Sequence, residues 1–539
     1  MTGADVPEPG AAARAVHPAP PTADPATRLD GLPVTRRHVR LLVGSGVGWT
    51  FDAMDVGLIS FVIAQLAVVW GTDATTLGWV ASAGFVGMAV GAAVGGLLAD
   101  RIGRRQVFAL TLLVYGVATG ASALVGGVAV LMALRFVVGL GLGAELPVAS
   151  TLVSEFAPPR IRGRAVVVLE SFWAVGWILA ALIGYLVVPS GDDGWRWALA
   201  LGALPALYSV VVRRGLPESV RYLQARGRHA EAEQVVAELE ASRAVGHGGL
   251  TGAQVRDAAT ARPSSAAADV ERHSSSAAGT DADRTSPAGT DADRTSPAGT
   301  DADRTSPAGA DRARSSSAGV APAPDPTAAT APDATAAPAP DPAPRLAALW
   351  APSLRRRTAA LWLVWFAVNF SYYGAFIWLP SLLAADGHTL VRSFEYTLII
   401  TLGQLPGYAA AAVLVETWGR RRTLAAFLAG SALAAGAFAA ASGDAQILGA
   451  GVMLSFFNLG AWGALYAVTP ELYPTRVRTT GAGWAAGIGR TASVLAPLAV
   501  PQLRELGGTG LLFTVFAAVF VVASAGALAL PERTGEALT

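Results

Sequence analysis

The sequence predicts an all-α membrane protein whose twelve transmembrane helices form two pseudo-symmetric six-helix bundles. Three observations carry this prediction: apolar segments of spanning length, an internal repeat and an apolar composition. The chain has 539 residues, of which 53% are hydrophobic and 15% charged, with 60 glycines. Because the apolar blocks are longer than a soluble core needs, we expect a multi-pass membrane protein.

Apolar segments occur six times before and six times after a central polar gap. They lie at about 41–70, 78–99, 107–125, 129–156, 165–189, 195–213, 358–385, 393–416, 423–441, 446–469, 479–503 and 509–530. A helix of about 20 residues crosses the hydrocarbon core of a bilayer, so each segment is long enough to span.

These segments predict five parts of the chain. They are a disordered N-terminal tail (1–38), a six-helix bundle (39–213), a cytoplasmic linker (214–357), a second six-helix bundle (358–531) and a C-terminal tail (532–539). The linker begins with an amphipathic piece and continues with three copies of AGTDADRTSP at 278–307. With so little to bury, the repeats are expected to be disordered. The tail lacks a cleavable signal, so the first helix is expected to be an uncleaved anchor.

Arginines in the short loops predict that both termini are cytoplasmic. If the N-terminus is inside, the inside loops hold Arg101, Arg104, Arg105, Arg160, Arg162, Arg164, Arg420, Arg421, Arg422, Arg476 and Arg478. The outside loops hold only Arg196, Arg392 and Arg504. This bias follows the positive-inside rule.

An internal repeat relates the two halves. GLLADRIGRR at 96–105 matches AVLVETWGRR at 412–421, and SEFAPPRIR at 154–162 matches PELYPTRVR at 470–478. Both pairs share one offset, 316 residues (412 − 96 and 470 − 154). Two halves in parallel topology, with a central cavity between them, are therefore predicted.

Several motifs resemble those of the major facilitator superfamily. GLLADRIGRR resembles its loop 2–3 signature, RFVVGLGLG its helix 4 motif, and LPESVRYL the segment that closes the first half of sugar-porter-like members. Within the superfamily, GWTFDAMDVGLISF, ELPVASTLVSE, LESFWAVGW, FSYYGAFIWLP, QLPGY and SFFNLGAWGALYAVTPELYPTRVR are similar to the bacterial niacin permease group. That group is itself similar to organic anion and cation transporters and to synaptic vesicle glycoprotein 2. The central insertion departs from this pattern.

Two carboxylates in the first helix indicate a transport pathway. Asp52 and Asp55 lie about 18 and 22 Å along a helix from Arg40, near or beyond the middle of the bilayer. A charge at that depth costs at least about 2.5 kcal/mol on insertion scales, so such residues face the bundle interior. We expect them to couple transport to protons or to substrate. The alternative is a structural ion pair with an arginine of the bundle.

Further charged residues extend this proton-coupling set. Arg135 resembles the helix 4 arginine that pairs with a helix 1 carboxylate in proton-linked sugar symporters, and the resemblance implies an Asp52–Arg135 pair. Glu145 and Glu170 are two more acids at membrane depth. Each could bind a proton, although a structural hydrogen bond to a neighbouring helix is the preferred interpretation for both.

Arg490 is the predicted binding residue for a substrate anion. It lies twelve residues, about 18 Å, from Arg478 along the eleventh span. A guanidinium at that depth needs an anion, and its planar fork suits a carboxylate. The resemblance to organic anion transporters implies the same role. The alternative is a structural partner for a buried acid.

Aromatic side chains at matching depths are predicted to form the rest of the pocket. The 316-residue offset brings Trp173 level with Arg490, Asp55 level with Tyr372, and Glu145 level with Trp462. A flat heteroaromatic ring could stack on such side chains, and Tyr466 or Asn458 could bond a ring nitrogen. The predicted substrate-binding set is Arg490, Trp173, Tyr372, Tyr373, Trp462, Tyr466 and Asn458. Packing or interfacial anchoring is the alternative for each aromatic residue.

Charges that recur at the inner ends of both halves predict a cytoplasmic gate. They are Asp100, Arg104, Glu155, Arg164, Glu416, Arg420, Glu471 and Arg476. Opposite charges can bridge helix ends while the carrier faces outward and separate when it opens inward. The positive-inside rule alone explains the arginines but not the paired acids.

Other chemistry is not indicated. No phosphate-binding loop for ATP occurs, the six histidines have no metal-ligand spacing, and the chain has no cysteine. GLGLG in the fourth span follows no strand, and we interpret it as small residues that let helices pack closely. We expect no cofactor, no metal, no nucleic-acid partner and no enzymatic activity.

The resemblance and the site together predict a plasma-membrane carrier. It would import a small aromatic monocarboxylate by alternating access coupled to protons, and nicotinate is the preferred candidate. It would act as a monomer. Three alternatives stay open: a benzoate-type aromatic acid symporter, an organic ion or drug exporter, and a non-transporting receptor. The buried arginine argues against a cation as substrate.

Overall fold

The computed structural model describes residues 24–159, 161–244, 342–474 and 477–532, which belong to one compact unit. The predictions for 1–23, for the 278–307 repeats, for Arg476 and for 533–539 lie outside these residues. The same holds for the side chain of Arg164.

The first bundle contains α2 to α8. Its helices are α2 (Arg36–Val69), α3 (Ala74–Ile102), α4 (Arg104–Ser122), α5 (Val128–Phe156), α6 (Arg162–Leu186), the short η1 (Val188–Ser190), α7 (Gly194–Leu201) and α8 (Leu204–Gly215). The sixth span consists of α7 and α8, which meet at Gly202 and Ala203, with Pro205 in the first turn of α8. Pro at that position lacks only an N–H that has no intrahelical partner.

The second bundle contains α13 to α18. Its helices are α13 (Arg355–Ala385), α14 (Leu390–Leu402), α15 (Gln404–Thr417), α16 (Arg420–Ala439), α17 (Asp444–Val468), the short η3 (Thr469–Glu471) and α18 (Arg478–Leu528). Gly403 separates α14 from α15 within one span. Gly508, at φ 69°, interrupts α18 and divides it into two spans.

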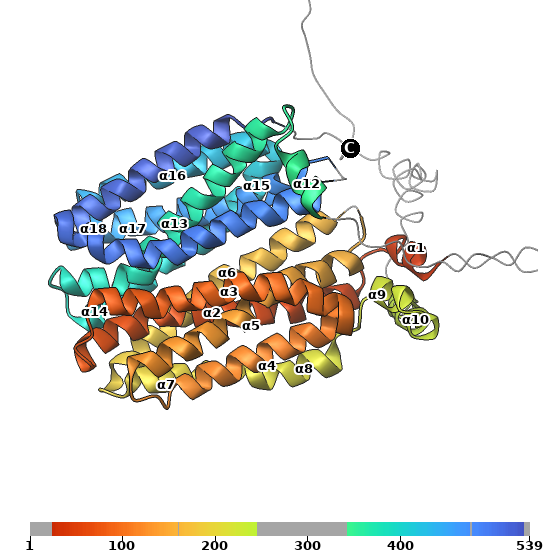
Figure 1. The fold of residues 1–539 in the computed structure, drawn as a ribbon, viewed down its shortest axis with the longest axis horizontal. Coiled ribbons are helices and arrows are strands. Elements are labelled where there is room, and N and C mark those ends of the chain that lie inside the picture. Colours follow the sequence, from red (N-terminus) through yellow and green to blue (C-terminus); the bar gives the residue numbers. More distant parts are fainter. Residues whose placement is uncertain (1–23, 160, 245–341, 475–476, 533–539) are drawn as a thin grey trace, which may run out of the picture. The chain divides into compact units, whose positions relative to one another are not determined.

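The twelve predicted spans are confirmed in the part of the chain that the structure describes. Ten helical stretches are long and apolar enough to cross a membrane, and one of them, Thr480–Leu528, contains two spans. The 19-residue helix α4 completes the set. Figure 1 shows the two bundles, with α2 to α8 in red to yellow and α13 to α18 in green to blue.

Short helices mark one end of both bundles, which we call the terminal face. They are α1 (Pro25–Asp30), α9 (Val220–Ala225), α10 (His229–Ala244) and α12 (Pro342–Leu349), and Figure 1 shows all four at the same end. The other end is the opposite face.

An ion-pair cluster attaches α1 to α10 at the terminal face. The Arg28 guanidinium lies 2.5 Å from Glu233 and 2.6 Å from Glu240. The hydrogen bond from Arg28 lowers the pKa of the Glu240 carboxyl. Arg37 at the start of α2 also pairs with Glu238. The segment before the first span is therefore bound to the helix after the sixth.

The pseudo-symmetry of the two halves extends to backbone angles. Gly103 has φ 105° and ψ 152°, and its repeat equivalent Gly419 has φ 107° and ψ 151°. Such a backbone is rarely adopted by residues with a Cβ atom, so both turns need glycine. Each glycine starts a helix, α4 or α16, directly after the preceding span.

A carboxylate caps the helix that follows each of these glycines. Glu218 accepts hydrogen bonds from the backbone N–H groups of Arg104 (2.9 Å) and Arg105 (3.2 Å). Glu532 accepts from those of Arg420 (3.1 Å) and Arg421 (3.4 Å). A negative charge at a helix N-terminus is favourable, and it also satisfies N–H groups that have no intrahelical partner. The end of each bundle is thereby bound to its third helix.

Glycines bring α3 and α5 into backbone contact. A Cβ atom on Gly91 would lie 2.1 Å from the Leu140 carbonyl oxygen, and one on Gly143 would lie 2.0 Å from that of Met88. The GLGLG segment thus allows close helix packing, as predicted.

The two bundles touch each other near the opposite face. The Ser82 hydroxyl of α3 donates to the Val494 carbonyl of α18 at 2.8 Å. The rings of Phe61 on α2 and Phe394 on α14 are 5.2 Å apart in an edge-to-face arrangement. These contacts close the interface between the bundles at that face.

Candidate substrate and coupling site

A buried ion pair joins three helices of the first bundle. Arg135 of α5 donates through Nη1 to Asp55 Oδ2 of α2 at 3.0 Å. The Thr119 hydroxyl of α4 donates to Asp55 Oδ1 at 2.5 Å and accepts from Arg135 Nη2 at 3.2 Å. The side chains of Asp55 and Arg135 are 2% and 4% exposed, so each charge depends on the other for compensation.

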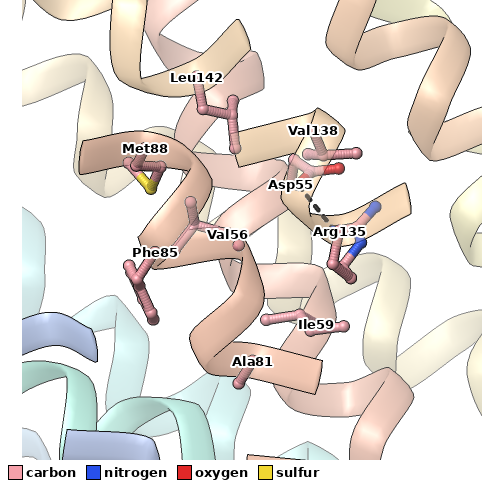
Figure 2. A pocket seen from close by; sticks show the side chains of 10 residues that line it. Asp55, Val56, Ile59, Ala81, Phe85, Met88, Arg135, Val138 and Leu142 are labelled. Atoms are coloured by element: carbon pink, nitrogen blue, oxygen red, sulfur yellow. Dashed lines mark hydrogen bonds and ion pairs between the residues drawn. The ribbon is translucent and has the colours of Figure 1, made fainter. Parts of the chain in front are cut away.

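A small cavity borders this pair. Figure 2 shows Asp55 and Arg135 pointing toward each other, with apolar side chains around them. The cavity has a volume of about 30 Å³, and its lining includes Val56, Phe85 and Val138. That volume is enough for a water molecule, so the pair has a place where water could reach it.

The expected pairing of Asp52 with Arg135 is wrong, because the structure pairs Arg135 with Asp55. Helix α5 starts at the opposite face, at Val128, and Arg135 lies about 10 Å along it. Of the two acids of α2, Asp55 lies about 4.5 Å nearer that face. Sequence spacing showed that both acids share a face of α2 but not which one matched the depth of Arg135.

Asp52 instead faces Glu145 of α5 and Tyr115 of α4. All three side chains are buried, at 1%, 0% and 0% exposure. The structure therefore divides four of the five predicted coupling residues into an ion pair, Asp55 with Arg135, and a second acidic group, Asp52 with Glu145. The fifth, Glu170 of α6, lies near Arg490 and Trp49.

Arg490 of α18 lies where side chains of both bundles converge. Its nearest charged or titratable neighbours are Tyr373 of α13, Tyr466 of α17 and Glu170 of α6. Among the described side chains, no carboxylate oxygen comes within 4.0 Å of the guanidinium. Arg490 is half-buried, and its guanidinium is not held in an ion pair with a described acid.

The predicted aromatic residues form one continuous cluster across the two bundles. The indole Nε1 of Trp173 on α6 donates to the Tyr372 hydroxyl on α13 at 3.3 Å. The Tyr372 ring lies 5.0 Å from Tyr373 and 5.9 Å from Trp462. Trp462 in turn stacks on Tyr466, with 5.8 Å between centroids and 26° between planes. These aromatic residues and Arg490 therefore share one region of the interface between the bundles.

Asn458 lies one helical turn before Trp462 on α17 and is 1% exposed. Neither its Oδ1 nor its Nδ2 has a hydrogen-bond partner among the described residues. An unpaired buried amide carries a desolvation cost of about 1 to 3 kcal/mol, which a bound polar group would remove.

Three tryptophans of this cluster were not predicted from the sequence. Trp49 lies 5.1 Å from Trp173, Trp177 lies 5.7 Å from Tyr372, and Trp365 lies 5.3 Å from Tyr466. Helical spacing could have found two of them, because Trp177 follows Trp173 by four residues and Trp365 precedes Tyr372 by seven.

The gate charges whose side chains the structure describes lie at the terminal face. The ion pairs that join described side chains there each lie within one bundle. Arg104 binds Asp100 at 2.9 Å and approaches Glu155 at 3.8 Å, and Arg420 binds Glu471. Glu416 is exposed. The contacts between the bundles described above lie near the opposite face and in the aromatic cluster, and this arrangement is the one expected when such a gate is open.

Two related helical bundles that enclose buried charges and an aromatic cluster define a multi-pass membrane carrier with the major facilitator fold. A family model for sugar (and other) transporters matches residues 48–248 and 317–538. The chain belongs to this family and is a multi-pass transporter of the cell membrane, as the resemblance implied.

Similar proteins match nearly the whole chain. It is 39% identical to the niacin transporter NiaP of Acinetobacter baylyi over 512 residues, which cover 95% of this chain and 98% of that protein. It is 38% identical to the putative niacin/nicotinamide transporter NiaP of Bacillus subtilis, with 93% and 97% covered. The partially occluded inward open conformation of the Escherichia coli xylose transporter XylE has the same fold, with a TM-score of 0.63, 16% identity and 93% and 99% coverage.

Proposed function

We propose that this protein imports a small aromatic monocarboxylate by alternating access coupled to protons, with nicotinate as the preferred substrate. Two relatives that carry niacin in their names are 38 to 39% identical over almost the full length, which supports this substrate. In this proposal the terminal face is cytoplasmic.

One observation carries the substrate class. The Arg490 guanidinium has no carboxylate within 4.0 Å among the described residues, and the aromatic cluster lies beside it. A guanidinium binds a carboxylate through two parallel hydrogen bonds, and aromatic faces accept a flat ring. An aromatic acid supplies both groups. Asn458 or Tyr466 would bond a ring nitrogen.

The other charged residues have separate roles in this proposal. Asp52, Asp55, Arg135, Glu145 and Glu170 would couple uptake to protons, since they are buried acids and one arginine on the path between the faces. The charges of the terminal face would close the inner gate when ion pairs form between the bundles instead of within them.

Uptake of labelled nicotinate into proteoliposomes tests the role of Arg490. Arg490→Ala should weaken nicotinate affinity at least about tenfold, because a charged hydrogen bond of about 1.5 to 3 kcal/mol is lost. Arg490→Lys should lie between the alanine variant and the wild type, because lysine keeps the charge but not the planar fork.

Arg504→Ala is the matched control, because Arg504 lies on the same helix but pairs with Asp386 near the opposite face. Its nicotinate affinity should equal that of the wild type. Unchanged affinity in Arg490→Ala would refute the assigned role. Stronger competition by benzoate than by pyridine carboxylates would favour the benzoate-type alternative.

A further inference from the structure

Asp52 and Glu145 form a buried acidic pair without a cation. Asp52 is 1% exposed and Glu145 is 0% exposed. Among the described side chains, no arginine or histidine nitrogen lies within 4.0 Å of either carboxyl group. Arg135, the cation of this region, is bound to Asp55. We call this pair the Asp52–Glu145 dyad.

Helix packing holds Glu145 against the face of α2 that carries Asp52. A Cβ atom on Gly48 would lie 2.8 Å from Glu145 Oε1. Gly48 and Asp52 are four residues apart and therefore share one helix face. The glycine thus lets the Glu145 carboxyl approach the α2 backbone one turn away from Asp52.

Most polar atoms of the dyad have no hydrogen-bond partner. Both carboxyl oxygens of Asp52 and Glu145 Oε1 are buried without one. Glu145 Oε2 has only the Thr111 hydroxyl, at 3.4 Å. The Tyr115 hydroxyl is fully buried and lies beside Asp52. Buried polar atoms from three helices therefore converge here, and a proton shared between the two carboxyl groups would satisfy them.

The other titratable groups that face the dyad add no positive charge. They are Asp55 of α2, Tyr115 of α4 and Tyr208 of α8. Two ionised carboxylates are acceptors only and cannot satisfy each other, whereas a carboxylic acid donates one hydrogen bond to its neighbour. Two carboxylates that face each other in a dry site also repel, which disfavours the ionisation of both.

We propose that the Asp52–Glu145 dyad holds the transported proton, shared between the two carboxyl groups. The Asp55–Arg135 pair stays ionised, because each of its charges already compensates the other. This inference rests on the proposed function and deepens it by assigning the proton to one site. When the carrier opens to the opposite face, the dyad takes up one proton. It releases that proton at the terminal face together with one monocarboxylate anion, so no net charge crosses.

Infrared difference spectroscopy of the purified protein, without substrate, tests where the proton is. A pH titration of the wild type should show the carbonyl band of a protonated carboxyl. Asp52→Asn and Glu145→Gln should each shift this band, and the double variant should lose it. Asp55→Asn with Arg135→Gln should leave it in place. A band that neither dyad substitution moves would overturn the proposal, whichever substrate the protein carries.

Proteoliposomes test the coupling. With one proton per substrate, a gradient of about one pH unit supports about tenfold accumulation of nicotinate. The double variant Asp52→Asn/Glu145→Gln should lose this accumulation, while counterflow at equal pH persists within about threefold. Glu505→Gln, an exposed glutamate of α18, is the control for the same chemical change and should accumulate normally. Accumulation that persists in the double variant would contradict the proposal.

Sodium is the competing ligand for such a site. If NaCl in place of choline chloride raises the Tm of the wild type but not of the double variant, the dyad is a sodium site and the proton assignment is wrong. Equal Tm values in both salts agree with a proton.

Discussion

At the scale of single residues, the buried Asp55–Arg135 ion pair is costly to break, because each charge would be left without its partner inside the membrane. Thr119 binds both partners, so three helices depend on one ion pair. Breaking a buried pair by removing one partner costs about 3 to 5 kcal/mol, whereas replacing both partners is often nearly neutral. The pair therefore contributes little to the net free energy of unfolding. Its main effect is to fix which helices meet.

A double-mutant cycle tests that statement at the same scale. Asp55→Asn should lower the Tm of the purified protein strongly, because Arg135 is left buried and uncompensated. Adding Arg135→Gln should restore most of the loss. The measurement is thermal unfolding in detergent. Additive losses in the double variant would show that the two charges do not stabilise each other.

At the scale of helices, backbone contact sets how the first bundle is built. Gly91 and Gly143 bring α3 and α5 so close that carbonyl oxygens of one helix occupy the space of a side chain on the other. Glycine costs about 0.5 to 1 kcal/mol relative to alanine inside a helix, so its use here needs a reason such as this contact. The backbones of the two helices therefore pack directly against each other, without side chains between them at these positions.

Two glycines of α3 provide a matched comparison. Gly91→Ala places a methyl group about 2.1 Å from the Leu140 carbonyl oxygen and should lower both Tm and folded yield. Gly96→Ala, with nothing within 4 Å, should be neutral or stabilise by up to about 1 kcal/mol. Fluorescence-detected size-exclusion chromatography with a heating step measures both. Equal Tm values in the two variants would contradict close packing of α3 on α5.

At the scale of the whole molecule, the described contacts between the bundles lie near the opposite face and in the central aromatic cluster. The opposite face is closed by contacts of Ser82 and Phe61 with the second bundle. At the terminal face, each described ion pair joins two residues of the same bundle. Alternating access requires the reverse pattern at another stage of the cycle. The structure therefore represents the conformation that is closed at the opposite face.

Cross-linking tests this assignment, and the absence of native cysteines makes the background clean. A Phe61→Cys/Phe394→Cys variant joined by a short thiol-reactive linker should be held in the present conformation, because the two rings are 5.2 Å apart. Its nicotinate counterflow should stop and should return when the linker is cleaved. Each single-cysteine variant is a control. Counterflow that continues in the linked protein would mean that these positions do not separate during transport.

Much of the fold could be predicted from the sequence, because bilayer thickness fixes how long an apolar segment must be. The repeat predicted the halves, and GLGLG predicted the close packing of α5. The partner of Arg135 could not be predicted, since the depth at which α5 crosses α2 depends on tertiary packing. Trp49 could not be predicted as part of the cluster, because a tryptophan in a span usually packs or anchors and only the three-dimensional contact places it beside Trp173.

The carboxylates of Glu218 and Glu532 bind the residues that follow the last span of each half to the start of its own third span. The end of each half is thus hydrogen-bonded to its own bundle. Because each half is closed by its own carboxylate, we expect changes in the length or sequence of 245–341 to leave both bundles stable. In the sequence, the 97 residues 245–341 lie between two halves whose internal symmetry is still visible in their backbone angles.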